Sequence, residues 1–86
     1  MDTSWSALIT ECMEKNKITE PLIHCTLTVG ELYSQFDNGF GSTQGIPFTA
    51  WSENYVFFPV IYDGAEWVDY VPRNPCDFKK DHVGGG

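Results

Sequence analysis

The chain has 86 residues and a formal net charge of −7, and no Lys or Arg occurs between Lys17 and Arg73. Phosphate contacts need basic side chains, so this charge pattern excludes direct nucleic-acid binding and favours basic protein partners. That stretch holds seven acids: Glu20, Glu31, Asp37, Glu53, Asp63, Glu66 and Asp69.

The length fits a single domain, which we place at residues 1–83, followed by a disordered glycine tail at 84–86. A chain this small buries only about 60% of its unfolded surface. Large aromatic side chains, 15% of the residues, must therefore supply much of the core. Three widely spaced cysteines do not make a disulfide framework, and neither a secretory signal nor a membrane-spanning apolar run is visible. We expect a reduced, cytoplasmic protein with no membrane partner.

The first segment has the apolar spacing of an amphipathic helix. Apolar residues at i, i+3, i+4, i+7 and i+8 predict a helix over residues 4–15. They are Trp5, Leu8, Ile9, Cys12 and Met13.

A second helix is predicted over residues 29–37. Thr28 and Glu31 have the spacing of a capping box, and Asn38-Gly39 is a suitable helix end. The predicted buried face consists of Val29, Leu32, Tyr33 and Phe36.

The segments beside this helix are less regular. Residues 18–27 are apolar but contain Pro21, so we expect a linker or a short strand there rather than more helix. Residues 39–45 contain three glycines and read as a flexible loop. A phosphate-binding loop needs a strand before it and a helix after it, the reverse of the order predicted here.

Residues 46–72 are rich in β-branched and aromatic side chains and predict strands over 47–51, 55–62 and 65–71. Asp63-Gly64 predicts a two-residue type I′ hairpin. Pro59 cannot donate to a ladder, so we expect either a bulge or an unpaired amide side at that position. The hairpin sets the register that pairs Val60 with Trp67, Phe57 with Tyr70 and Val56 with Val71.

Together these elements predict an α+β fold, with two helices packed on one face of a small three-stranded antiparallel sheet arranged as a meander. Helices cover only one sheet face, so about half of the aromatic tract from Phe48 to Tyr70 should lie on an open face. Exposed Tyr and Trp dominate the hot spots of protein interfaces. The tract therefore indicates a partner surface or self-association.

Metal-competent side chains beyond Cys12 are limited to His24, Cys25, Cys76 and His82. Adjacent His24 and Cys25 have poor spacing for tetrahedral zinc, although the loop from Cys76 to His82 could hold a metal. We expect no metal and no cofactor, and a zinc-stabilised domain is the second alternative.

The sequence evidence for a catalytic site is also weak. A cysteine nucleophile needs nearby cations to lower the pKa of its thiol, and this chain is acidic. Glu66 and Asp69 are three residues apart in a predicted strand, so they point to opposite faces and cannot flank one bond. We expect that the protein is not an enzyme.

The C-terminal half resembles a group of short, mostly uncharacterised phage and prophage proteins. The similarity lies in residues 47–51 (PFTAW), 58–68 (FPVIYDGAEWV), 71–76 (VPRNPC) and 82–85 (HVGG). Small acidic proteins from such genomes include anti-CRISPR and anti-restriction inhibitors, which bind the cationic nucleic-acid channel of a host nuclease complex. The resemblance implies an anti-defence role without identifying the target.

The leading hypothesis is a non-enzymatic, phage-type inhibitor that binds a basic surface of a host defence complex, with acids standing in for phosphates. Reversing Asp63, Glu66 and Asp69 to Lys should then abolish binding and leave the fold intact. The alternative is a phage structural or assembly module that self-associates through an exposed aromatic sheet face. The predicted partner-binding residues are Glu53, Asp63, Glu66 and Asp69 on the sheet, Glu31 and Asp37 on the second helix, and the aromatic residues Tyr62 and Trp67.

Overall fold

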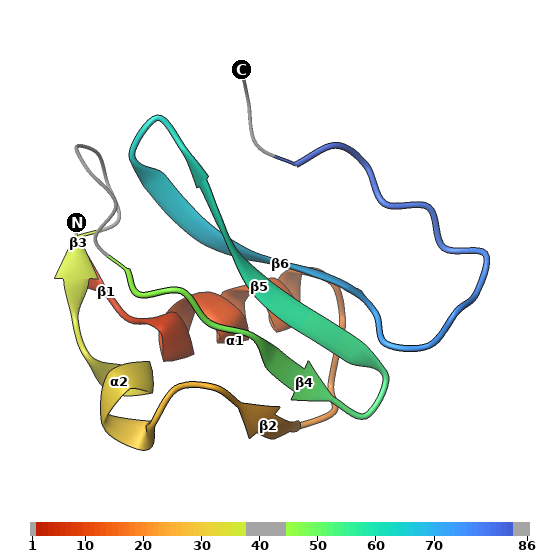
Figure 1. The fold of residues 1–86 in the computed structure, drawn as a ribbon, viewed down its shortest axis with the longest axis horizontal. Coiled ribbons are helices and arrows are strands. Elements are labelled where there is room, and N and C mark those ends of the chain that lie inside the picture. The colour runs from red at the N-terminus through yellow and green to blue at the C-terminus, as the bar shows by residue number, and fades with distance from the viewer. Residues whose placement is uncertain (1, 38–44, 84–86) are drawn as a thin grey trace.

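A computed structural model describes residues 2–37 and 45–83, and it is an α+β fold as predicted (Figure 1). The predicted loop over 39–45, apart from Gly45, and the predicted disordered tail at 84–86 lie outside the described residues. The elements are β1 (Asp2–Thr3), α1 (Trp5–Lys15), β2 (Leu22–Cys25), α2 (Val29–Tyr33), β3 (Phe36–Asp37), β4 (Ala50–Ser52), β5 (Tyr55–Tyr62) and β6 (Ala65–Pro72).

Helix α1 confirms the predicted first helix and begins and ends with local capping bonds. The Ser4 hydroxyl accepts a 3.2 Å hydrogen bond from the amide of Ala7. At the other end Lys17 adopts φ 58°, and Ile18 N–H donates to Met13 O at 2.8 Å. This is a Schellman termination with Lys where glycine is usual. Neither helix in the described part of the chain is long and apolar enough to cross a membrane.

Helix α2 is shorter than predicted. The capping box is present, since Thr28 Oγ1 accepts from Glu31 N at 3.1 Å and Glu31 Oε1 accepts from Thr28 N at 2.9 Å. The helix ends at Tyr33 because Phe36 leaves the helical path, packs its ring on Trp5 at 4.9 Å and forms β3 opposite β1. None of the residues of α2 is buried, so the predicted buried face is wrong for Val29 and Tyr33.

The sheet has four strands, in the order β2-β4-β5-β6, rather than the predicted three. The fourth strand is β2, from the apolar segment that the sequence left as a linker or a strand, and it pairs antiparallel with β4. The predicted strand at 47–51 is shorter and lies at Ala50–Ser52. A separate two-stranded sheet joins β1 and β3.

The β5–β6 hairpin confirms the predicted register, with Val60 opposite Trp67, Phe57 opposite Tyr70 and Val56 opposite Val71. Asp63 (φ 52°) and Gly64 (φ 83°) both have positive φ, as a type I′ turn requires.

Pro59 is accommodated without a bulge. The β5–β6 register runs through Pro59 and Val68 without a shift. Hydrogen-bonded and non-hydrogen-bonded pairs alternate from the turn, which places Pro59 in a non-bonded pair with its nitrogen directed away from β6. On the other side of β5, the pairing with β4 ends at Phe57. The missing N–H of Pro59 therefore costs no hydrogen bond of the sheet. Of the two expected solutions, the unpaired amide side is the one found.

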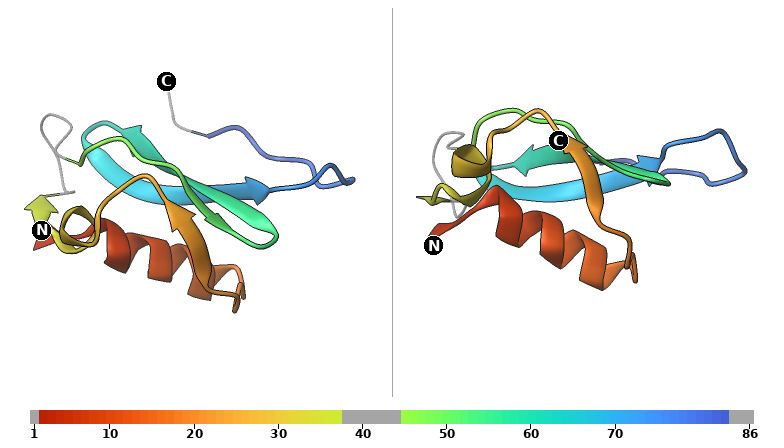
Figure 2. Two further views of the ribbon diagram at one scale, coloured as in Figure 1. Left: turned by 60° about the horizontal axis from the view of Figure 1, so that its bottom comes forward. Right: turned by 90° about the horizontal axis from the view of Figure 1, so that it is seen from below.

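The core lies between α1 and one face of the sheet. Figure 2 shows α1 lying across that face, while α2 lies beside the beginning of α1 and packs mainly on that helix. The prediction that both helices cover the sheet therefore holds only for α1. The buried core residues are Trp5, Leu8, Ile9, Cys12, Ile18, Phe48, Ala50, Phe57 and Val68.

Candidate protein-binding surface

The sheet face opposite α1 carries apolar side chains that lie outside the core cluster, and of these Val60 is itself buried, at 7% exposed. Side chains alternate along a strand, and Phe57 and Val68 point into the core, so their neighbours in the sequence point away. We call this surface the open sheet face. In the described part of the chain none of its members belongs to the core cluster. The open sheet face consists of His24, Trp51, Val56, Phe58, Val60, Tyr62, Ala65, Trp67, Asp69 and Val71.

The predicted division of the aromatic tract is therefore found. Phe48, Phe57, Tyr55 and Tyr70 pack in or against the core, whereas Trp51, Phe58, Tyr62 and Trp67 lie on the open sheet face.

The two predicted aromatic hot spots are exposed. Tyr62 is 49% and Trp67 is 37% exposed. They occupy diagonal positions on β5 and β6, within the reach of large side chains across a strand pair. At the other side of the face, the rings of His24 and Trp51 contact each other at 5.2 Å. The centre of the face is apolar, as in the buried centre of protein interfaces.

Two of the predicted acids, Glu53 and Asp63, are exposed in turns at opposite ends of β5. The strand has 8 residues, so at about 3.3 Å per residue these turns are about 26 Å apart. Neighbouring phosphates on one DNA strand advance by about 3.4 Å along the helix axis. Glu53 and Asp63 therefore flank the open sheet face and do not form one row of adjacent phosphate-like charges.

The turn that carries Glu53 is firmly held. Asn54 donates through its backbone N–H to Glu20 Oε2 at 2.6 Å and through its side chain to Glu20 Oε1 at 2.9 Å. Hydrogen bonds from Ser52 and then Asn54 lower the pKa of the Glu20 carboxyl. Arg73 N–H donates to Asn54 O at 2.9 Å. Glu53 is thus presented from a fixed backbone.

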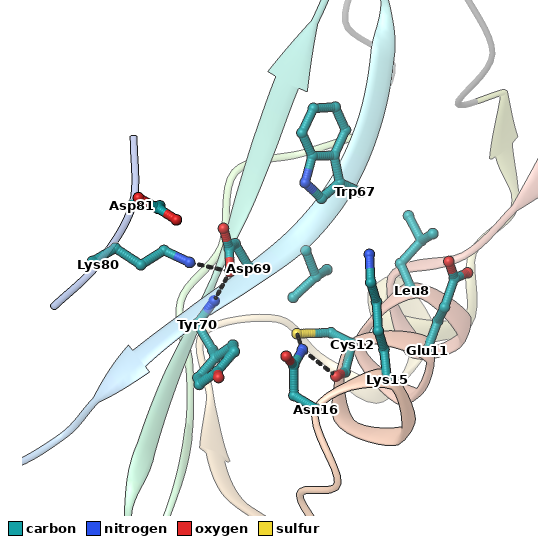
Figure 3. A pocket seen from close by; sticks show the side chains of 11 residues that line it. Leu8, Glu11, Cys12, Lys15, Asn16, Trp67, Asp69, Tyr70, Lys80 and Asp81 are labelled. Carbon is teal, nitrogen blue, oxygen red and sulfur yellow. Dashed lines mark hydrogen bonds and ion pairs between the residues drawn. The ribbon is translucent and has the colours of Figure 1, made fainter. Parts of the chain in front are cut away.

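Asp69 is already paired within the molecule. Its Oδ1 lies 2.5 Å from Lys80 Nζ and accepts a 2.8 Å hydrogen bond from the amide of Tyr70 (Figure 3). Because β6 is an edge strand, this second bond also satisfies a backbone donor at the sheet edge. Asp69 is therefore a poorer candidate for a partner contact than the sequence indicated.

Glu66 is not a surface acid, although its predicted role in partner binding requires an exposed carboxylate. Its side chain is 3% exposed, and its Oε1 accepts a 3.0 Å hydrogen bond from the amide of Gly45. It lies on the same side of β6 as Val68, facing Trp5 rather than solvent. Reversing its charge would therefore disturb the core, contrary to the expectation that a triple reversal leaves the fold intact.

The two acids placed on the second helix separate in the structure. Glu31 is exposed on α2 and serves the capping box. Asp37 lies in β3, opposite Asp2, and not on a helix. Neither belongs to the open sheet face.

The four metal-competent residues are not brought together. His24 and Cys25 lie on β2 at one edge of the sheet, and Cys76 and His82 lie in the tail that follows β6, the opposite edge strand. Residues 2–37 and 45–83 contain no group of three or more His, Cys, Asp or Glu placed to hold a metal ion.

A groove of about 410 Å³ lies between α1, β6 and the tail, with Cys12 and Lys15 on one wall and Asp69 and Lys80 on the other (Figure 3). Burial, with a contribution from the charge of Asp69, raises the pKa of the Cys12 thiol. Asn16 Nδ2 lies 3.8 Å from its sulfur. Burial therefore disfavours the thiolate, which is the reactive form of cysteine.

Sequence reasoning did not name Trp51, Phe58 and Val71 as members of the open sheet face. The alternation along 55–62 places Val56, Phe58, Val60 and Tyr62 on one face, which the sequence alone could have shown. No protein-family model, curated protein or solved structure matches this chain significantly.

Proposed function

We propose that the protein is a non-enzymatic, phage-encoded inhibitor that acts in the host cytoplasm. It binds a basic protein surface of a nucleic-acid-targeting defence complex through the open sheet face. The observation that carries this proposal is that Tyr62 and Trp67 are exposed outside the core, on a chain that has no Lys or Arg from 18 to 72. The phage resemblance of the C-terminal half supplies the class of partner.

Two kinds of side chain have different roles in the proposed binding: aromatic residues provide affinity, and acids speed the approach to the basic partner. Large aromatic side chains at the centre of an interface contribute most of its binding energy. Exposed acids such as Glu53 and Asp63 mainly accelerate association with a positively charged surface, and their effect weakens with salt. Glu66 is buried and Asp69 is paired, so the exposed aromatic residues carry the affinity and the rim acids carry the charge complementarity.

The test is affinity capture from a lysate of the bacterial host, followed by mass spectrometry. The wild type should capture a nucleic-acid-targeting defence complex, and the double variant Tyr62→Ala/Trp67→Ala should not. Tyr33→Ala is the matched control, because Tyr33 is 64% exposed on α2 and outside the open sheet face. With the purified partner, each hot-spot truncation should weaken binding by about 30-fold, which corresponds to about 2 kcal/mol. Equal capture by the double variant would reject the open sheet face as the binding surface.

A second test measures the effect of the rim charges separately from that of the aromatic contacts. Asp63→Asn with Glu53→Gln removes two rim charges, and Asn is also well suited to the positive φ of residue 63. This variant should associate more slowly at low salt and resemble the wild type at high salt. Glu14→Gln, an exposed site on α1, controls for the loss of negative charge. An unchanged association rate would show that the rim acids have no steering role.

Self-association is the second candidate function, because the apolar centre of the open sheet face would also suit a second copy of the chain in a phage assembly module. Sedimentation equilibrium at rising protein concentration distinguishes the two. A dimer that dissociates in Trp67→Ala, together with capture of phage proteins only, would favour self-association over inhibition.

A further inference from the structure

Strand β6 has a long outer edge that pairs with no other strand in the described part of the chain. The four-stranded sheet has the order β2-β4-β5-β6, so β6 bonds to β5 on one side only. It has 8 residues, whereas β2, the strand at the opposite edge, has 4. Edge strands present N–H and C=O groups to which a strand of another chain can add, and proteins protect such edges with specific features.

The register of the hairpin shows which groups of β6 point outward. Bonded pairs alternate from the two-residue turn, so the N–H and C=O groups of Glu66, Val68 and Tyr70 point away from β5. Pro72, the next position in this series, has no N–H. Val68 lines the groove between α1, β6 and the tail, and among the described residues no backbone group outside β5 is bonded to it. The middle of the edge therefore has backbone groups that another strand could use.

The tail after β6 is attached beside this edge at two adjacent positions. Lys80 Nζ lies 2.5 Å from Asp69 Oδ1 (Figure 3), and the ring of Phe78 lies 5.8 Å from that of Tyr70. The Lys80 ammonium is also 5.3 Å from the centre of the Tyr70 ring. Asp69 Oδ1 accepts the outward N–H of Tyr70 at 2.8 Å. We call residues 73–83, which these contacts hold beside β6, the strap.

The ion pair that holds the strap contributes little to the stability of the fold. Asp69 and Lys80 are both partly exposed, and ion pairs in contact with water add little to the free energy of unfolding. Lysine at a sheet edge is, in contrast, a common protection against strand addition. A strand that added to β6 would displace Lys80 and break the bond between Asp69 and the N–H of Tyr70. These contacts therefore oppose strand addition more than they stabilise the monomer.

We propose that the strap prevents β6 from pairing with the β6 of a second copy of the chain. Antiparallel pairing centred on Val68 would place the outward groups of the two strands opposite each other, because a two-fold axis repeats the same positions on both strands. Phe78 and Lys80 hold the strap in the path of that second strand. Release of the strap would join two four-stranded sheets into one. The inference concerns the edge of β6 rather than the open sheet face, and it does not depend on the inhibitor function.

The experiment releases the strap without changing the sheet. Phe78→Ala/Lys80→Ala removes both attachments. Asp77→Ala/Lys79→Ala is the matched control, because these neighbouring side chains of the strap make no hydrogen bond or ion pair in the described part of the chain. Sedimentation equilibrium of the full chain at rising protein concentration measures association. The strap variant should dimerise at least about ten-fold more tightly than the wild type and the control, although the loss of Lys80 makes it more acidic.

Amide hydrogen exchange followed by NMR locates the interface. In the strap variant, the amides of Val68 and Tyr70 should become protected as the protein concentration rises, whereas in the wild type their exchange should not depend on concentration. Lys80→Ala releases one attachment only and should show a smaller effect of the same kind. Association through the open sheet face would leave these edge amides unprotected.

Three results would overturn the proposal. The first is equal association of the wild type, Lys80→Ala and the strap variant. The second is association of the strap variant without protection of Val68 and Tyr70. The third is concentration-dependent protection of Val68 in the wild type, since the strap would then not block the edge.

Discussion

The buried carboxylate of Glu66 accepts a 3.0 Å hydrogen bond from the backbone amide of Gly45, 21 residues earlier in the chain. The same place is closed by the indole of Trp5, which is 1% exposed and donates through Nε1 to Ile46 O at 3.0 Å. Helix α1, strand β6 and the segment before β4 therefore meet at one contact. An acid that belongs by sequence to the charged stretch acts here as a core residue.

We predict that Glu66→Lys strongly destabilises the protein. The substitution removes the acceptor for Gly45 N–H and places an ammonium in a buried site, at a cost of about 3–5 kcal/mol. Glu66→Gln keeps an acceptor oxygen and should cost about 1 kcal/mol. Denaturant unfolding followed by circular dichroism measures both. Asp63→Asn, an exposed site with the same charge change as Glu66→Gln, should stay within about 0.5 kcal/mol of the wild type. Equal effects at the two sites would contradict the burial of Glu66.

Gly45 should not tolerate a side chain. A Cβ atom at this position would overlap Trp5 Cζ2, and the Trp5 side chain is buried in the core. We expect Gly45→Ala to lower the free energy of unfolding by about 1–3 kcal/mol through overpacking. Gly30→Ala is the control, because a Cβ there would meet only Thr28 Oγ1, at 3.9 Å. That change should instead stabilise α2 by up to about 1 kcal/mol. Thermal melting of the two variants should therefore move in opposite directions.

The contact between Glu20 and the β4–β5 turn should depend on pH. Hydrogen bonds from Ser52 and Asn54 lower the pKa of Glu20 in the folded state. Its contribution to stability is therefore complete above the unfolded pKa of about 4.3 and is lost as the pH falls through the lower folded value. Glu20→Gln removes this titration.

Melting temperatures measured from pH 7 down to pH 2.5 test this expectation. Glu20→Gln should lower the melting temperature at pH 7 and should show a smaller further loss in acid than the wild type. Glu14→Gln, at an exposed site on α1, should retain the acid dependence of the wild type. Parallel curves for the wild type and Glu20→Gln would show that the Glu20 contacts do not stabilise the turn.

We predict that replacing Lys17 by glycine stabilises the folded protein. Its φ of 58° is in the left-handed region, where a side chain costs about 1–2 kcal/mol. Glycine removes that cost, but it also raises the conformational entropy of the unfolded chain, which offsets part of the gain. Lys17→Gly should therefore raise the free energy of unfolding by about 0.5–1 kcal/mol. Lys15→Gly makes the same change within α1 and should lower the free energy of unfolding by about 1 kcal/mol. A loss of stability in Lys17→Gly under the same denaturant titration would contradict the Schellman termination.

The features that were predicted correctly depend on short-range interactions. The period of Trp5, Leu8, Ile9 and Cys12 is enough to predict α1, because one helical face needs only local spacing. The register of β5 and β6 follows from the turn at Asp63-Gly64, which brings adjacent segments together with one alignment. The capping box at Thr28 was likewise predicted, since its two hydrogen bonds span three residues.

The errors come from contacts between distant segments. Phe36 continued the apolar pattern of a helix, but its contact with Trp5 and the pairing of β3 with β1 end α2 at Tyr33. The segment at 22–25 becomes a strand because it pairs with β4, whose residues lie 25 to 30 positions further along the chain. Glu66 is an ordinary solvated acid by local pattern, and only the approach of Gly45 and Trp5 buries it.

By itself the sequence determined the acidic charge, the α+β class, α1 and the alignment of the long hairpin, because each depends on composition or on neighbours along the chain. The alternation along β5 and β6 also divided their aromatic side chains into two sets. Only the tertiary structure decided which set is open, since that depends on the face on which Trp5, Leu8, Ile9 and Cys12 of α1 are buried. Packing of one helix against Phe57 and Val68 left Tyr62 and Trp67 exposed, and so created the surface on which the proposed function rests.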